Sequence, residues 1–145
     1  LHSFSRRQRQ MCIRDSGSFM HIYSRVKDKC PVEVVPAITG MSAAWTATDI
    51  PITWGDDILT VLMGTLDKTT LENQLQDTNA AIIMKIGRNL PKIKKALERT
   101  GRFYDAFIVE YAAMDKQTVQ RLSDYNTENA PYFSIIILHG QGRRP

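Results

Sequence analysis

The sequence AAIIMKIGRNLPKIKKAL, residues 80–97, decides the fold class, because an apolar run in it passes directly into a helical pattern. Residues 80–86 are apolar except for one lysine, which predicts a strand. Asn89 can cap the helix that follows, and Pro91 falls in its permissive first turn. The apolar face of this helix would consist of Leu90, Ile93 and Leu97. A strand followed by a helix is the unit from which α/β sheets are built.

The same alternation continues on both sides of this unit. Apolar or β-branched runs predict further strands at residues 32–35, 58–63, 103–111 and 132–138, with residues 58–63 buried. Helical spacing or composition predicts helices at residues 19–29, 41–47 and 69–76. Residues 116–123 fit either a helix or a strand. Together these segments predict an α/β domain with a parallel or mixed sheet and flanking helices.

Some helix boundaries have their own sequence signals. Residues 69–72, Thr-Thr-Leu-Glu, have the spacing of a capping box, so we expect Thr69 to begin the helix there. Gly101 stands just past the helix that follows Asn89 and can end it. The lysines of that helix, which are Lys92, Lys94 and Lys95, are expected to face water.

The positive charge of the chain is concentrated near its two ends. The formal net charge is +4, yet six arginines lie within residues 1–16 and 143–145. Without these segments, 13 Lys plus Arg stand against 14 Asp plus Glu. A basic surface that binds nucleic acid is therefore not expected.

Cysteine, histidine and apolar content argue against several other classes. The two cysteines, Cys12 and Cys30, give no disulfide framework, and the three histidines are too far apart in sequence for a metal site. The longest apolar run, residues 132–138, is far shorter than the ~20 residues of a membrane-spanning helix. No signal peptide is recognisable. We expect a cytoplasmic protein with no metal and no membrane or nucleic-acid partner.

Two turns place polar groups where a ligand could bind. Thr39 and Gly40 lie between an expected strand and an expected helix, which is where open α/β sheets bind ligands. Arg88 follows another strand, and its guanidinium group could hold a carboxylate with two hydrogen bonds. The alternatives are an ordinary structural turn and a surface arginine.

The loop at residues 50–57 contains proline, glycine and two carboxylates, which mark a loop or a domain boundary. Trp54, Asp56 and Asp57 bring an aromatic ring and two acids together there, and they could hold a metal or steer a proton. A solvated turn leading into a strand is the alternative. No nucleophile elbow, Walker loop or dinucleotide fingerprint occurs elsewhere in the sequence.

Several stretches together resemble one family. They are GSF at residues 17–19, VEVVPAITGMS at 32–42, PITWGDDILTVLMGT at 51–65, IMKIGRNLPK at 83–92 and APYFSIIILHGQGRRP at 130–145. In this order they resemble the tetrapyrrole methyltransferases, particularly those of the corrin pathway to cobalamin. The resemblance implies a two-domain α/β enzyme that binds S-adenosylmethionine between its domains and methylates a uroporphyrin-derived ring. It also implies a homodimer at full length.

The resemblance also implies which positions bind the cofactor. They are Gly17, Thr39, Gly40, Met84 and Ala112. Gly17 matches the last glycine of the family motif Gly-Asp-Pro-x-x-Tyr-Gly. Ala37 replaces a usual glycine before Thr39, and two alanines replace the Gly-Thr pair at residues 112 and 113, so only a backbone contact carries over at Ala112. Substrate contacts are expected at Trp54, Asp56, Asp57 and Arg88.

The domain organisation follows from the resemblance and from composition. We expect residues 1–16 to be a foreign or disordered leader, residues 17–50 a remnant of an amino-terminal α/β domain, and residues 51–145 a carboxy-terminal α/β domain. The family's glycine-rich cofactor loop has no counterpart here, so we expect little or no activity from this chain. A methyltransferase acting at another corrin carbon or on a cobalt-bearing ring, and a non-catalytic α/β fragment, are the alternatives.

Overall fold

The computed structural model describes residues 19–33 and 38–142, and contacts divide the chain into two compact units. The first unit spans residues 1–40 and the second spans residues 41–145. The domain boundary predicted at residues 50 and 51 lies further along the chain, and it remains a prediction.

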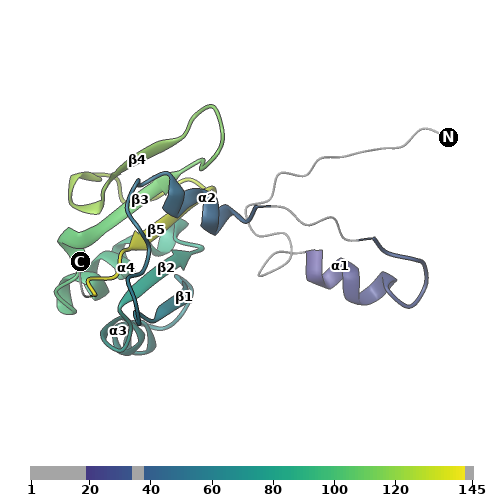
Figure 1. Ribbon diagram of the computed structural model, residues 1–145, viewed down its shortest axis with the longest axis horizontal. Coiled ribbons are helices and arrows are strands. Elements are labelled where there is room, and N and C mark those ends of the chain that lie inside the picture. The colour runs from purple at the N-terminus through teal and green to yellow at the C-terminus, as the bar shows by residue number, and fades with distance from the viewer. Residues whose placement is uncertain (1–18, 34–37, 143–145) are drawn as a thin grey trace. The chain divides into compact units, whose positions relative to one another are not determined.

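The first unit contains helix α1, Phe19–Val26 (Figure 1). This confirms the helix predicted at residues 19–29, although residues 27–29 form a turn instead of a last helical turn. Residues 32 and 33 have no regular structure, so the strand predicted at residues 32–35 is wrong at these two positions. Residues 34 and 35 lie outside the described residues.

The second unit is built on a mixed sheet with the strand order β1-β2-β5-β3-β4. The strands are β1 (Leu59–Met63), β2 (Ala80–Met84), β3 (Ala106–Glu110), β4 (Thr118–Arg121) and β5 (Ser134–Leu138). The helices are α2 (Gly40–Thr46, which begins at the unit boundary), α3 (Lys68–Gln76) and α4 (Leu90–Arg99). Short 3-10 helices occupy Gly87–Asn89, Phe103–Asp105 and Leu122–Asp124. The predicted α/β class and mixed sheet are confirmed.

The strand directions distinguish the two ends of the sheet at which the strands start or finish. Strands β1 and β2 are parallel, and β5 is antiparallel to both β2 and β3, so β1, β2 and β3 all run the same way. We call the end of the sheet where these three strands finish the carboxyl edge; β5 starts there. At the other end, which we call the opposite edge, β3 starts and β5 finishes.

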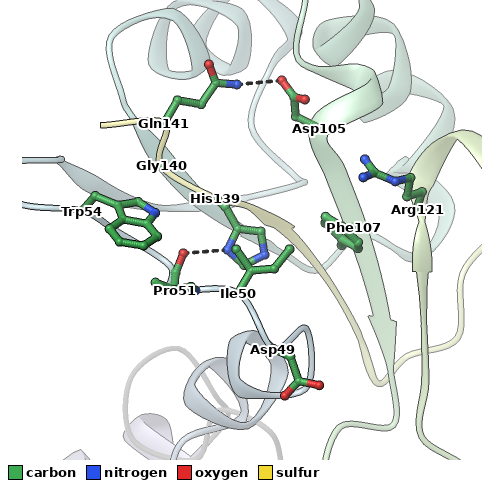
Figure 2. A pocket seen from close by; sticks show the side chains of 10 residues that line it. All are labelled: Asp49, Ile50, Pro51, Trp54, Asp105, Phe107, Arg121, His139, Gly140 and Gln141. Carbon is green, nitrogen blue, oxygen red and sulfur yellow. Dashed lines mark hydrogen bonds between the residues drawn. The ribbon is translucent and has the colours of Figure 1, made fainter. Parts of the chain in front are cut away.

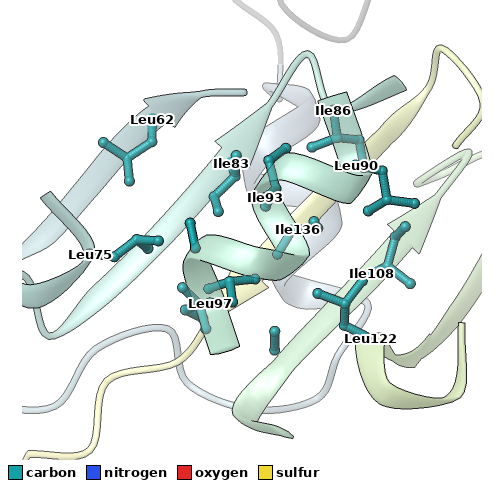
Figure 3. Close-up of a cluster of buried hydrophobic side chains, with 14 of the residues drawn as sticks. Leu62, Leu75, Ile83, Ile86, Leu90, Ile93, Leu97, Ile108, Leu122 and Ile136 are labelled. Carbon is teal, nitrogen blue, oxygen red and sulfur yellow. The ribbon is translucent and has the colours of Figure 1, made fainter. Parts of the chain in front are cut away.

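Helices α3 and α4 cover one face of the sheet and enclose the main core (Figure 3). Ile83, Ile136 and Ile108 stand side by side on β2, β5 and β3, and all three are fully buried. Leu75 of α3 and Leu97 of α4 pack into the same cluster. Burying a side chain of this size stabilises the fold by about 2 kcal/mol, so this layer fixes the strands that carry the candidate site.

Position in the sheet explains which strands are buried throughout. The inner strands β2 and β5 are buried at every residue, and their sequences are AAIIM and SIIIL. Strand β1 lies at a sheet edge, where only Leu62 is buried and Val61 is exposed. The prediction that residues 58–63 form a buried strand is therefore right for the strand and wrong for its burial. The ambiguous residues 116–123 form edge strand β4 and the start of a 3-10 helix.

Two predicted helix caps differ in detail from the structure. Helix α3 is capped by Asp67 and not by Thr69, because the Asp67 carboxylate accepts hydrogen bonds from the backbone N–H and the hydroxyl of Thr70. These two bonds also lower the pKa of Asp67. Asn89 does precede α4, but its side-chain amide donates to the carbonyl of Lys85 at 3.1 Å and caps no helical N–H.

Two of the three lysines on α4 do not face water as predicted. Lys92 donates to the carbonyl of Leu66 at 2.5 Å. Lys94 donates to the carbonyl of Tyr125, and its ammonium group lies 5.6 Å from the centre of the Tyr125 ring. A long lysine stem can cover apolar surface while its charged end finds a partner. Lys95 is exposed, as predicted.

Within residues 19–33 and 38–142, no helix has the length and apolar character needed to cross a membrane.

Candidate functional site

The carboxyl edge of the sheet brings together three of the residues predicted to bind cofactor or substrate. Met84 ends β2, Arg88 lies in the 3-10 turn that follows, and Ala112 lies just after β3. Strand β5 separates β2 from β3, so the loops that follow these two strands are about 10 Å apart, or two strand spacings. This span would suit a small ligand lying across the edge.

The backbone at this edge is unusual. Lys85, directly after β2, has φ +55°, while Tyr111 and Ala113, directly after β3, have φ +51° and +58°. The left-handed region costs a residue with a side chain roughly 1 kcal/mol or more, and such conformations cluster at ligand sites. The loops are held from neighbouring strands, since the N–H of Tyr111 donates to the carbonyl of Phe133 at 2.7 Å and that of Gly64 donates to the carbonyl of Met84 at 2.7 Å.

Met84 and Ala112 have the properties that one side of a nucleoside site needs. Both are nearly fully buried and apolar, with exposed fractions of 4% and 5%. In the part of the chain that the structure describes, the backbone N–H and carbonyl of Ala112 have no hydrogen-bond partner. The free backbone groups of Ala112 could therefore form hydrogen bonds to a ligand at this edge.

Arg88 is exposed, and its guanidinium group makes no hydrogen bond or ion pair to any residue of the described ranges. Lys85 is equally exposed, and its ammonium group is likewise without a partner there. Sequence reasoning singled out Arg88 and missed Lys85, because a lysine at the end of an apolar run carries no motif. Its signal in the structure is its left-handed backbone. Both cations are available to an anionic ligand.

The predicted group of Trp54, Asp56 and Asp57 does not lie at the carboxyl edge. The Asp57 carboxylate accepts hydrogen bonds from the N–H of Trp54 at 3.0 Å and from the N–H of Gly142 at 3.2 Å. This ties the loop to the segment that follows β5, beyond the opposite edge. Asp56 is exposed, and Asp57 acts locally as a clamp between two backbone segments.

The remaining predicted cofactor residues belong to the first unit or to its boundary. Thr39 precedes α2, and Gly40 is its first residue. Gly17 and the substituted Ala37 lie outside the described residues. The roles of Gly17, Thr39 and Gly40 stay predictions.

Sequence reasoning also missed a cluster of polar groups near the carboxyl edge. Glu110 accepts hydrogen bonds from the Tyr125 hydroxyl at 2.6 Å and from the Thr118 hydroxyl at 3.2 Å. Burial raises the pKa of Tyr125, and the bond to Glu110 raises it further. Ser134, paired with Glu110 in the sheet, is buried, and its hydroxyl has no partner among the described residues. The cluster joins residues from three strands and the segment after β4, which no local pattern indicates.

A cavity of about 440 Å³ opens at the opposite edge (Figure 2). Its walls are aromatic and apolar at Trp54, Phe107 and Ile50, and charged at Asp105 and Arg121. Figure 2 shows that the carboxylate of Asp105 and the amide of Gln141 are paired, at 2.9 Å. The Arg121 guanidinium lies 5.0 Å from the centre of the Phe107 ring and donates to the carbonyl of Tyr104. Asp105 and Arg121 therefore already have partners.

His139, which also lines this cavity, should make the stability of the second unit depend on pH. Burial lowers its pKa below the ordinary 6.5, against a smaller opposite effect of the hydrogen bond between its Nδ1 and the carbonyl of Pro51. The unfolded chain thus binds a proton at a pH where the folded chain does not. The contribution to stability is complete above about pH 6.5 and is lost as the pH falls further. We expect the thermal unfolding midpoint to fall between about pH 7 and pH 5, and to fall less in His139→Gln.

The matched control is His21→Gln, because His21 is exposed on α1 in the first unit. This variant should keep the pH dependence of the wild type. Equal pH dependence in His139→Gln and wild type would contradict the assignment to His139.

Comparison with known proteins gives matches along most of the chain. A family model described as Tetrapyrrole (Corrin/Porphyrin) Methylases matches residues 15–124. The chain is 44% identical over 129 residues to a precorrin-2 C(20)-methyltransferase from Sinorhizobium sp.. That match covers 89% of this chain and 53% of the relative, so the chain spans about half the length of this relative.

Solved structures share the fold. A cobalt precorrin-4 methyltransferase, CbiF, superposes with a TM-score of 0.64 at 19% identity, over 88% of this chain and 59% of that one. A uroporphyrin-III C-methyltransferase from Thermus thermophilus, complexed with S-adenosylhomocysteine, gives a TM-score of 0.56 at 21% identity, over 83% of this chain and 58% of that one. At these identities the likeness shows the fold alone.

Proposed function

Because the chain belongs to the tetrapyrrole (corrin/porphyrin) methylases, we propose that it is the carboxy-terminal part of an S-adenosylmethionine-dependent methyltransferase that acts at C(20) of precorrin-2 in cobalamin synthesis. The identity to the Sinorhizobium enzyme supports this substrate. The structural observation that carries the proposal is the carboxyl edge, where Met84, Ala112 and Arg88 come together from two strand ends.

The carboxyl edge would hold one side of the cofactor. When bound, S-adenosylmethionine supplies an electrophilic methyl group on a sulfonium sulfur. Met84 would provide an apolar wall, and Ala112 would offer its unused backbone groups to the adenosine part. Gly17, Thr39 and Gly40 are proposed to contact the same cofactor on the grounds of the family resemblance alone. Such contacts promote methyl transfer by fixing both reactants in line and by excluding water.

The substrate contacts in the proposal differ in their structural support. Arg88 has a free, exposed guanidinium group that can bind the acetate and propionate groups of the ring. Asp57 would have to give up its bonds to Trp54 and Gly142 to polarise a pyrrole nitrogen. Trp54 and Asp56 remain proposed contacts on the grounds of sequence alone.

For this chain by itself, the proposal includes weak cofactor binding and little or no turnover. It spans about half of the Sinorhizobium relative, and the residues proposed here would meet only one side of the cofactor. The proposal also includes a cytoplasmic location and a homodimer at full length. Methylation at another corrin carbon, or of cobalt-precorrin-2, would use the same edge.

Titration of the ¹⁵N-labelled chain with S-adenosylhomocysteine, followed by NMR, tests the cofactor site. We expect a millimolar dissociation constant, which corresponds to about 4 kcal/mol of binding free energy. The amides of residues 84–88 and 111–113 should shift, because they form the carboxyl edge. Amides around the His139 cavity are the internal control and should not shift. Shifts confined to the cavity would contradict the proposed site, and no shifts at millimolar ligand would favour a non-catalytic fragment.

A further inference from the structure

Tyr132 stands at the middle of the carboxyl edge. The N–H of Ala130 donates to the carbonyl of Gly87 at 3.5 Å, so the segment before β5 lies against the loop that follows β2. On the other side, the N–H of Tyr111 donates to the carbonyl of Phe133 at 2.7 Å. The segment 130–133 therefore lies between the loop that carries Arg88 and the loop that carries Ala112.

The side chain of Tyr132 is 84% exposed, an unusual state for a large ring. It rests edge-on against Phe133, with the ring centres 5.1 Å apart and the planes at 85°. Phe133 in turn lies 6.1 Å from the Tyr111 ring. This T-shaped contact holds the Tyr132 ring in place, and its high exposure leaves ring surface open on which a flat partner can stack.

The charges around Tyr132 indicate which flat partner would bind. Lys85 and Arg88, on the adjacent loop, are both exposed, and neither side chain has a partner in residues 19–33 and 38–142. A neutral adenine ring would leave both cations unpaired. A flat ring that carries several carboxylates would pair with both of them and stack on the tyrosine as well.

We propose that Tyr132 is a substrate-binding residue that stacks on the face of the tetrapyrrole, while Lys85 and Arg88 pair with its peripheral carboxylates. This inference rests on the proposed function for the class of substrate. It adds a ring contact that positions the substrate over the same edge that receives the cofactor. Tyr132 makes no hydrogen bond that would give it a structural role among the described residues.

Binding of uroporphyrin I, a fluorescent tetrapyrrole that carries carboxylates around its rim, tests this inference by fluorescence titration of the whole chain. Tyr132→Ala should weaken binding roughly fivefold, in line with about 1 kcal/mol for an aromatic stack. Tyr132→Phe keeps the ring and should bind as the wild type does. Because the side chain is exposed, both variants should keep the wild-type unfolding midpoint.

The chain offers a matched control in Tyr104. It is 73% exposed and also rests edge-on against a phenylalanine, Phe103, at 5.4 Å, but it lies at the opposite edge. Tyr104→Ala should leave uroporphyrin binding unchanged. Equal losses in Tyr104→Ala and Tyr132→Ala would overturn the inference, because they would indicate non-specific adsorption.

Two further outcomes separate this inference from the proposed function. Wild-type chain that binds S-adenosylhomocysteine at the carboxyl edge but does not bind uroporphyrin I would overturn the role of Tyr132 and leave the proposed function standing. Tyr132→Ala that loses S-adenosylhomocysteine binding and keeps uroporphyrin binding would also overturn it, by assigning the ring to the cofactor. Absence of S-adenosylhomocysteine binding in the wild type counts against the proposed function itself.

Discussion

Gly64→Ala is expected to lower the free energy of unfolding by about 3 kcal/mol, near the top of the range for overpacking. Gly64 follows β1, and a Cβ on it would lie 2.8 Å from Ile93 Cδ1 and 2.9 Å from the carbonyl oxygen of Lys85. The Ile93 side chain could move away, but the Lys85 backbone is held in its left-handed turn after β2. Urea unfolding followed by circular dichroism measures the loss. The alanine would also displace the backbone around Met84, because the N–H of Gly64 bonds to the carbonyl of Met84. Ligand binding at the carboxyl edge should therefore weaken as well.

Gly55→Ala is the control, because nothing lies within 4 Å of a Cβ at that position. It should cost only the strain of a left-handed alanine, roughly 1 kcal/mol, since φ of Gly55 is +52°. Adding Ile93→Val to Gly64→Ala should restore only part of the loss, because the contact with the Lys85 carbonyl remains. A Gly64→Ala variant as stable as the wild type would contradict the expected overpacking against the Lys85 backbone.

Gly140→Ala is expected to cost about 2 kcal/mol. A Cβ on Gly140 would overlap the carboxylate of Asp57 and would lie 2.8 Å from its Cγ. Asp57 cannot turn away cheaply, because its carboxylate holds the backbone N–H groups of Trp54 and Gly142. The N–H of Gly140 itself donates to the carbonyl of Ile52 at 2.8 Å, so the glycine cannot shift without losing that bond. Thermal unfolding measures the effect.

A double-mutant cycle with Asp57→Ala isolates this contact. The single Asp57→Ala change should itself destabilise the chain, since it leaves two N–H groups without their acceptor. In that background Gly140→Ala should cost far less, because the obstructing carboxylate is gone. Strictly additive losses would contradict a direct clash between the two residues.

The sequence predicted best those elements whose burial restricts many positions to apolar residues. Strands β2 and β5 are buried at every residue, so all their residues except Ser134 are apolar and the runs are conspicuous. Helix α4 has one buried face, which gives a clear period. Edge strand β4 has three exposed residues out of four, so its sequence TVQR carries little signal. The strand order could not be predicted, because pairing joins residues such as Ile83 and Ile136 that are far apart in sequence.

The candidate site was predictable only where a family motif or the place of a residue in an expected loop marks it. Family likeness pointed to Met84 and Ala112, the position and charge of Arg88 pointed to that residue, and all three lie at one edge of the sheet. Loop position and charge also suggested Trp54 and Asp57 as ligand contacts, whereas the Asp57 carboxylate is engaged by backbone beyond the opposite edge. Lys85 and Tyr132 were missed because their signals are a left-handed backbone and an exposed ring, which are properties of the folded chain.

The place of β5 in the sheet has a consequence for how the chain is made. It is the last strand in sequence, yet it lies between β2 and β3 and is their only hydrogen-bonded link in the described sheet. On the ribosome, β1 and β2 can pair early, while β3 has to wait for residues 134–138 before it can join them. Until then the backbone edges of β2 and β3 that pair with β5 stay open, and unpaired strand edges invite aggregation and chaperone binding. A chain stalled on the ribosome before Ser134 could form only two separate pieces of sheet, β1-β2 and β3-β4. Once residues 134–138 have left the ribosome, β5 can join these pieces into one sheet.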